Sequence, residues 1–134
     1  MKTLFTKGEF KEYQQVVSTA DCAIFENVEG HSVLSTFALA RNAEWVCRLF
    51  VIDMKEEHEE GIGIFLEIEH LSPALVGQTV SYVGKFETQI ENTISCSFCA
   101  KVGQRIVAKG RTEQKVLNRE KINQIFKSHS GKGN

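Results

Sequence analysis

The stretch Thr36-Phe-Ala-Leu-Ala-Arg-Asn-Ala-Glu-Trp-Val-Cys-Arg-Leu-Phe-Val-Ile-Asp-Met54 is the only long helical pattern in the chain. Its apolar residues at helical spacing are Leu39, Ala43, Val46 and Phe50. Trp45 and Ile52 add apolar side chains on other faces, and a helix that is apolar almost all round is typically buried. We therefore predict a central helix that the rest of the protein encloses.

The size and charge of the chain fit one intracellular domain. The sequence has 134 residues, and we predict one domain over residues 1–134 with a flexible tail from about residue 128. Because 16 Lys and Arg face 17 Asp and Glu, neither nucleic acid nor a membrane is implied as a partner. The chain has no signal-peptide core and its four cysteines lack a secreted disulfide spacing. We expect a cytoplasmic location.

The residues that flank the helical stretch predict its ends and the element that follows. Ser35 or Thr36 can cap the helix with a hydroxyl, and the acidic segment 56–61 predicts an end near Glu57. From Gly61 the apolar period changes to two, which predicts a strand. The residues expected on its core-like face are Ile64, Leu66, Ile68 and His70.

The remaining patterns predict further strands joined by short turns. Strand signals cover residues 10–17, where the signal is weak, and residues 78–90, 94–102 and 105–117. Gly84 is the expected bulge, and Asn118 can cap a short C-terminal helix whose inner side carries Ile122, Ile125 and Phe126. One helix followed by consecutive strands predicts an α+β fold with an antiparallel sheet packed on the helix.

Two polar residues interrupt the apolar faces. Glu44 lies between Ala43 and Trp45, where an unpaired charge would be costly. His70 ends the apolar row of its strand, where an aliphatic residue would be expected. Each residue alone fits a structural role equally well, and Thr36 alone fits a helix cap. Together, Glu44 and His70 can face the helix–sheet seam, where desolvation permits acid–base chemistry.

Several common site motifs are missing or misplaced. The sequence has no Gly-rich phosphate loop, no nucleophile elbow, no HExxH motif and no dinucleotide fingerprint. Cys96 and Cys99 form a C-x-x-C pair, but residues three apart on a strand lie on opposite faces, and no second pair completes four metal ligands. We predict structural cysteines and no metal site.

The order and spacing of the polar residues resemble a known family. The matching segments are Ser35-Thr36, Ala43-Glu44-Trp45, Gly63 and His70-Leu-Ser-Pro-Ala-Leu-Val-Gly77, followed by three strands and Gly110. Over about residues 30 to 127, this pattern resembles the hotdog-fold thioesterases of the fluoroacetyl-CoA thioesterase type. The resemblance implies a hotdog fold, in which an antiparallel sheet wraps a long central helix.

The resemblance also implies a homodimer that hydrolyses acyl-CoA thioesters at its interface. Carried over, the catalytic residues are Thr36, Glu44 and His70, and Gly63 is the substrate-binding glycine near the thioester carbonyl. Glu44 is then a base or nucleophile, His70 a proton shuttle, and Thr36 a nucleophile or a positioning hydroxyl. No cofactor is implied, because the CoA thioester is the substrate.

The chain departs from the family pattern in two places. Relatives often read Gly-x-His-x-Arg in the last strand, where this chain has Gly110-Arg-Thr-Glu-Gln114. The segment Gly30-His-Ser-Val-Leu34 lacks the aromatic lid residues associated with fluoroacetyl selectivity. We therefore expect an acyl-CoA thioesterase for a small or medium acyl group. The alternatives are a non-catalytic hotdog module that binds acyl-CoA and, with less support, a hydratase on the same fold.

Overall fold

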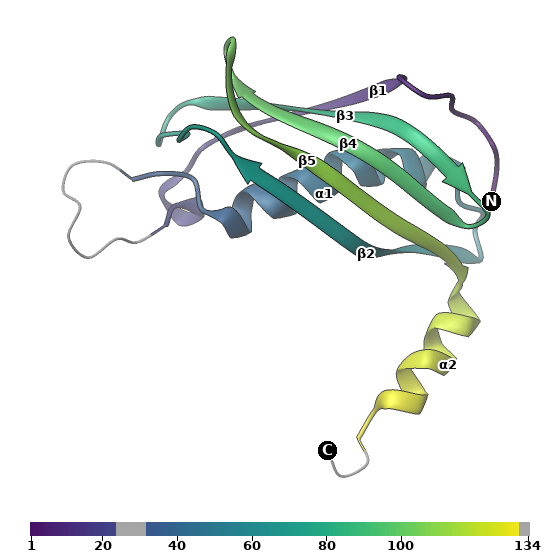
Figure 1. The fold of residues 1–134 in the computed structure, drawn as a ribbon. Coiled ribbons are helices and arrows are strands. Elements are labelled where there is room, and N and C mark those ends of the chain that lie inside the picture. The colour runs from purple at the N-terminus through teal and green to yellow at the C-terminus, as the bar shows by residue number, and fades with distance from the viewer. Residues whose placement is uncertain (24–31, 132–134) are drawn as a thin grey trace.

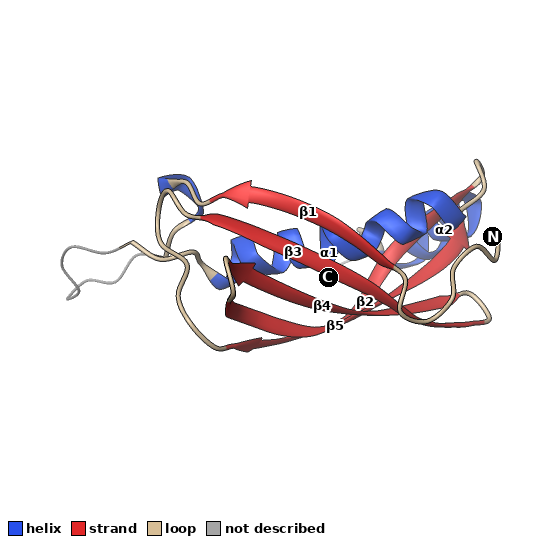
Figure 2. Cartoon of the chain, turned by 90° about the horizontal axis from the view of Figure 1, so that it is seen from above, coloured by secondary structure: helices blue, strands red, loops and turns tan. Residues whose placement is uncertain are grey.

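The fold is one long helix lying along one face of a five-stranded antiparallel sheet (Figure 1 and Figure 2). It is seen in a computed structural model that describes residues 1–23 and 32–131. The elements in chain order are β1 (Phe10–Val16), the 3-10 turn η1 (Thr19–Asp21), α1 (Thr36–Met54), β2 (Glu59–His70), β3 (Thr79–Ile90), β4 (Thr93–Val102), β5 (Arg105–Asn118) and α2 (Arg119–His129). The predicted α+β class is confirmed.

Helix α1 begins where the sequence predicts and ends earlier than expected. Ser35 is the cap, since its side chain accepts a hydrogen bond from the Ala38 N–H at 3.1 Å. Thr36 is therefore the first helical residue and its hydroxyl is not used as the cap. The helix ends at Met54, because Lys55 already has an extended backbone.

The helix is not enclosed on every side, which corrects the prediction. Its sheet-facing side is fully buried and includes Leu39, Ala43, Val46, Cys47, Phe50 and Val51. The opposite side exposes Phe37 at 78%, Trp45 at 41% and Ile52 at 41%. A single sheet covers only one side of a helix, so this apolar stripe stays open in one chain.

Strand β2 is an edge strand, because the order in the sheet is β1-β3-β4-β5-β2. Its residues Leu66, Ile68 and His70 share one face, as predicted, and Ile68 packs against the core. Ile64 and Leu66 are nevertheless exposed. Within the described chain, no strand pairs with the outer edge of β2, which explains the exposure of these two residues.

A β-bulge at Ile64 changes which residues of β2 face the helix. Gly63 and Phe65 pair with consecutive residues of β5, so Ile64 is an extra residue without a partner in the ladder. In a regular strand, Gly63 and His70 would face opposite sides, because an odd number of steps separates them. The bulge compensates for this offset, and both residues face α1.

Strands β3 to β5 alternate as predicted, but the expected bulge at Gly84 is absent. The register stays regular there and shifts instead between Phe86 and Thr88. Gly84 serves to make space, because a Cβ on it would lie 3.3 Å from the sulfur of Cys47. The close approach of helix and sheet explains this glycine.

The two cysteines of the C-x-x-C pair lie on opposite faces of β4, as predicted. Cys96 is buried and Cys99 is half-buried, and both are free thiols. Contact with Cys47 and burial raise the pKa of Cys96. Among the described residues, no group of three potential metal ligands comes together.

Helix α2 projects from the end of β5 away from the sheet (Figure 1). Asn118 caps it, as predicted, by accepting a hydrogen bond from the Glu120 N–H at 2.8 Å. Of its apolar residues only Ile122 is buried, whereas Phe126 is 63% exposed, which corrects the expected inner side. The helix covers part of the predicted tail, and the flexibility of that tail stays a prediction because residues 132–134 lie outside the described residues.

The lid segment and the absence of a membrane partner are the two remaining sequence expectations. The segment that lacks aromatic lid residues begins at Gly30, and residues 24–31 are outside the description. In the described ranges, no helix is both long and apolar enough to cross a membrane.

Candidate active site

The polar residues singled out in the sequence meet where α1 lies against β2, which we call the α1–β2 seam. They form two pairs. Glu44 lies against Gly63 near the middle of the helix, and Thr36 contacts His70 at the beginning of the helix. Each pair joins one residue of α1 to one residue of β2.

The carboxylate of Glu44 occupies the space where a side chain of residue 63 would lie. A Cβ on Gly63 would come within 2.7 Å of Glu44 Oε2, closer than real Cβ contacts. A side chain at position 63 would therefore displace this carboxylate, and glycine leaves Glu44 its place against the strand. Glu44 itself is only half-buried, so the cost of holding its charge is smaller than the sequence suggests.

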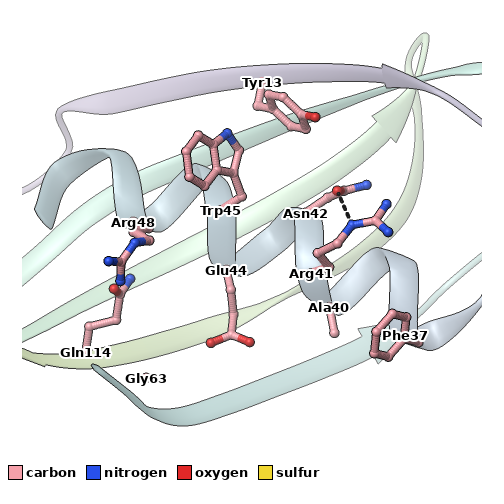
Figure 3. A pocket seen from close by; sticks show the side chains of 10 residues that line it. All are labelled: Tyr13, Phe37, Ala40, Arg41, Asn42, Glu44, Trp45, Arg48, Gly63 and Gln114. Atoms are coloured by element: carbon pink, nitrogen blue, oxygen red, sulfur yellow. Dashed lines mark hydrogen bonds between the residues drawn. The ribbon is translucent and has the colours of Figure 1, made fainter. Parts of the chain in front are cut away.

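Glu44 opens into a cleft of about 660 Å³ beside α1. The lining residues combine the aromatic side chains Tyr13, Phe37 and Trp45 with the polar side chains of Glu44, Arg48 and Gln114. Figure 3 shows Glu44 directed toward Gly63, with Trp45 and Tyr13 on the other side of the helix. A mostly apolar cleft with a few polar groups is the usual form of a small-molecule site.

Gln114 is a site candidate that the sequence marked only as a departure from a family pattern. It is 4% exposed, lines the cleft and lies directly opposite Gly63 in the pairing of β5 with β2. Directly opposed residues present their side chains on the same face. The amide of Gln114 therefore borders the space that Glu44 occupies, a neighbourhood that only the register reveals.

Charged residues at the edge of the cleft join the helix to the start of β2. Arg48 Nη2 lies 2.6 Å from Glu60 Oε1, and Arg48 Nη1 donates to the carbonyl oxygen of Gly61 at 2.9 Å. Burial alone would raise the pKa of Glu60. The Gly61 N–H and the charges of Lys55, Arg48 and Arg119 outweigh burial and hold that pKa below its usual range.

A buried polar cluster fixes the other side of the helix. Asn42 donates through its amide nitrogen to Gln15 at 2.6 Å and to the hydroxyl of Tyr82 at 3.1 Å. Burial raises the pKa of Tyr82, although the bond from Asn42 works against this. These bonds tie α1 to β1 and β3, so the helix presents Glu44 from a fixed position.

The second pair lies at the end of the seam. Thr36 Oγ1 and His70 Nε2 are 3.2 Å apart, within hydrogen-bond reach, and both side chains are exposed. They line a smaller cavity of about 230 Å³. A hydroxyl beside an imidazole is an arrangement in which a proton can pass between the two groups.

The structure does not bring the two pairs together within one chain. Thr36 and Glu44 are separated by about 12 Å of helical rise. The pairs also line different cavities. Glu44 and His70 both face the helix–sheet seam, as expected, but they lie at its two ends and line different cavities.

Both the sequence and the structure are similar to those of known proteins. A family model described as fluoroacetyl-CoA-specific thioesterase matches residues 17–120. Among curated proteins, none matches the chain.

Several solved structures are similar to this one. The fluoroacetyl-CoA thioesterase FlK has a TM-score of 0.85 at 20% identity, covering 96% of this chain and 100% of its own. A hypothetical protein of Thermus thermophilus, a thioesterase superfamily member, has a TM-score of 0.84 at 29% identity, covering 92% of this chain and 91% of its own.

A hot-dog-like protein of Thermanaerovibrio acidaminovorans also has a TM-score of 0.84, at 20% identity and with 96% of each chain covered. The fold is therefore the hotdog fold. Mutant forms of FlK have been solved with acetyl-CoA and with fluoroacetate and CoA.

Proposed function

The chain belongs to the fluoroacetyl-CoA-specific thioesterase family and is a thioester hydrolase, and from that premise we propose that it hydrolyses a small or medium acyl-CoA thioester to a carboxylic acid and CoA. The family match confirms the resemblance predicted from the sequence. We place the substrate in the cleft beside α1 because the Glu44 carboxylate lies there against Gly63 and the lining is mostly apolar.

In this proposal, the thioester carbonyl lies over Gly63 and Glu44 acts as the base. Glu44 takes a proton from a water that attacks the carbonyl carbon, the C–S bond breaks, and the CoA thiolate takes up a proton. A backbone N–H beside Gly63 stabilises the oxyanion. The bulge supports this role, because Ile64 has no partner in the ladder with β5.

Thr36 and His70 supply the second half of the proposed site. In the homodimer proposed below, His70 of one subunit carries a proton toward the sulfur of a thioester bound at Glu44 of the other subunit, and Thr36 holds the imidazole through their 3.2 Å contact. The distance along α1 argues against direct contact of Thr36 with Glu44 within one chain. This division of roles makes Glu44 the residue whose removal costs most.

We also propose that the active form is a homodimer built on β2. The outer edge of β2 carries the exposed apolar residues Ile64, Phe65 and Leu66, and α1 exposes Phe37 and Trp45. Pairing two β2 strands would cover an open edge that otherwise invites aggregation. Light scattering on the purified protein is expected to give twice the chain mass, and a monomer at micromolar concentration would contradict this.

A cytoplasmic location is part of the same proposal. All four cysteines are free thiols, which fits a reducing compartment.

The test is the release of free CoA thiol from a panel of short, medium and aryl acyl-CoA thioesters. We expect turnover by the natural chain and a loss of about 100-fold or more in kcat for Glu44→Gln, with binding of acyl-CoA retained. Glu57→Gln is the matched control, because Glu57 is an exposed carboxylate in the turn after α1. Binding without turnover by the natural chain would favour the non-catalytic module and contradict the proposal.

A further inference from the structure

Arg48 connects the helix that carries Glu44 to the strand that carries Gly63. It lies one turn after Glu44 and lines the same cleft (Figure 3). Its guanidinium donates to the carbonyl oxygen of Gly61 at 2.9 Å and to the carboxylate of Glu60 at 2.6 Å. Two bonds from a planar fork fix both the distance and the orientation of the strand relative to the helix.

The two glycines of β2 that face α1 have no side chains to set the distance between strand and helix. Both Gly61 and Gly63 face α1, where a Cβ would lie 2.7 Å from Val51 Cγ1 and 2.7 Å from Glu44 Oε2, respectively. Glycine permits the close approach but holds nothing in place, because it has no side chain to interdigitate. The bonds of Arg48 are therefore the polar attachment of this glycine segment to the helix.

Contacts with the first residue of α2 hold the Glu60 carboxylate and the start of β2 in place. The second oxygen of Glu60 lies 3.7 Å from the guanidinium of Arg119, the first residue of α2. The backbone N–H of Arg119 donates to the carbonyl of His58 at 2.8 Å. Arg48 thus binds a carboxylate that is itself anchored at the start of β2.

We propose that Arg48 is a positioning residue for the hydrolysis, which holds the Gly61–Gly63 backbone at the distance from Glu44 that the reaction requires. The inference rests on the proposed function, because it concerns the same site. Arg48 acts through the backbone of β2 and touches no reacting atom. A misplacement of about 1 Å in such a geometry can cost about 100-fold in rate.

The experiment compares Arg48→Met with Arg48→Lys and a matched control. Lys11→Met is that control, because Lys11 also joins the sheet to α1, through its ion pair with Asp53, but does not line the cleft or contact β2. With the best substrate of the natural chain, Arg48→Met is expected to lower kcat by about 10-fold to 100-fold, with KM within about three-fold. Arg48→Lys should recover part of kcat, and Lys11→Met should keep it.

Amide hydrogen exchange provides a readout that needs no turnover. The peptide that spans residues 59–66 is expected to exchange faster in Arg48→Met than in the natural chain, and the control should leave it unchanged. If Arg48→Met does not fold, Arg48→Lys and Glu60→Gln report on the same attachment.

Three results would overturn the proposal. The first is an Arg48→Met variant with unchanged kcat and KM. The second is a raised KM with unchanged kcat, which would make Arg48 a substrate-binding residue. The third is unchanged exchange of the 59–66 peptide. A natural chain that cleaves no acyl-CoA would refute the proposed function, and the exchange measurement would still decide whether Arg48 positions the strand.

Discussion

The two ends of the α1–β2 seam are held together in different ways. At the Glu44 end, two glycines face α1 so closely that a Cβ on either would lie 2.7 Å from a helix side chain, and Arg48 adds two hydrogen bonds. At the other end, one contact of 3.2 Å joins the exposed side chains of Thr36 and His70. The comparison teaches that the seam has a tightly packed end, suited to a fixed reaction distance, and an adjustable end, suited to a group that moves protons.

The sharpest test of the packed end is Gly63→Ala. The added methyl would collide with the Glu44 carboxylate, so we expect kcat for acyl-CoA hydrolysis to fall by about 100-fold or more. The measurement is steady-state kinetics together with thermal unfolding.

Gly61→Ala is the comparison variant. Its methyl would meet Val51 at the same distance and lie within 3.5 Å of Gln114 and Arg48, but it would not touch Glu44. Both variants should lose thermal stability, but Gly61→Ala should lose far less activity than Gly63→Ala. Equal losses of activity would mean that packing of the strand as a whole, and not the contact with Glu44, governs turnover.

The adjustable end is tested by Thr36→Val and Thr36→Ser. Loss of the hydroxyl should lower kcat by about 10-fold, because His70 loses its partner, and the serine variant should keep most of the activity. The melting temperature should hardly change, because Ser35 caps the helix and the lost contact is exposed. A loss above about 1000-fold would assign the attack on the thioester to Thr36 and make Glu44 the supporting residue.

The smallest expected effect concerns the pH dependence of the packed end. The pKa of Glu60 is held below its ordinary 4.5, so its ionised form adds stability at neutral pH, which is lost as the pH falls through the lowered pKa. Glu60→Gln should therefore melt about 2 °C below the natural chain at pH 7, and the difference should vanish in acid. Thermal unfolding followed by circular dichroism between pH 3 and 8 measures this, and a difference that grows in acid would contradict it.

The sequence predicted the main elements because their periodicities are strong and local. The helical pattern of α1 and the alternation in β4 come from residues whose neighbours in the chain decide their faces. The sequence did not predict the bulge at Ile64. An extra residue in a strand depends on its pairing with β5, which a local pattern does not contain.

The candidate site was predictable by residue type more than by arrangement. Glu44 and His70 stood out because each interrupts an apolar face. Gln114 and Arg48 did not, because polar residues at those positions are ordinary until the register and the helix packing place them beside Gly61 and Gly63. Long-range contacts decide which polar residues share a site, and they are absent from one sequence.

The bulge at Ile64 also limits how this strand can vary in length. Removing the one extra residue between Gly63 and Leu66 would restore a regular strand with six steps between Gly63 and His70, so both residues would still face α1. Homologous strands should therefore be able to lose the single extra residue at the bulge, whereas one residue gained or lost between Leu66 and His70 would turn His70 away from α1.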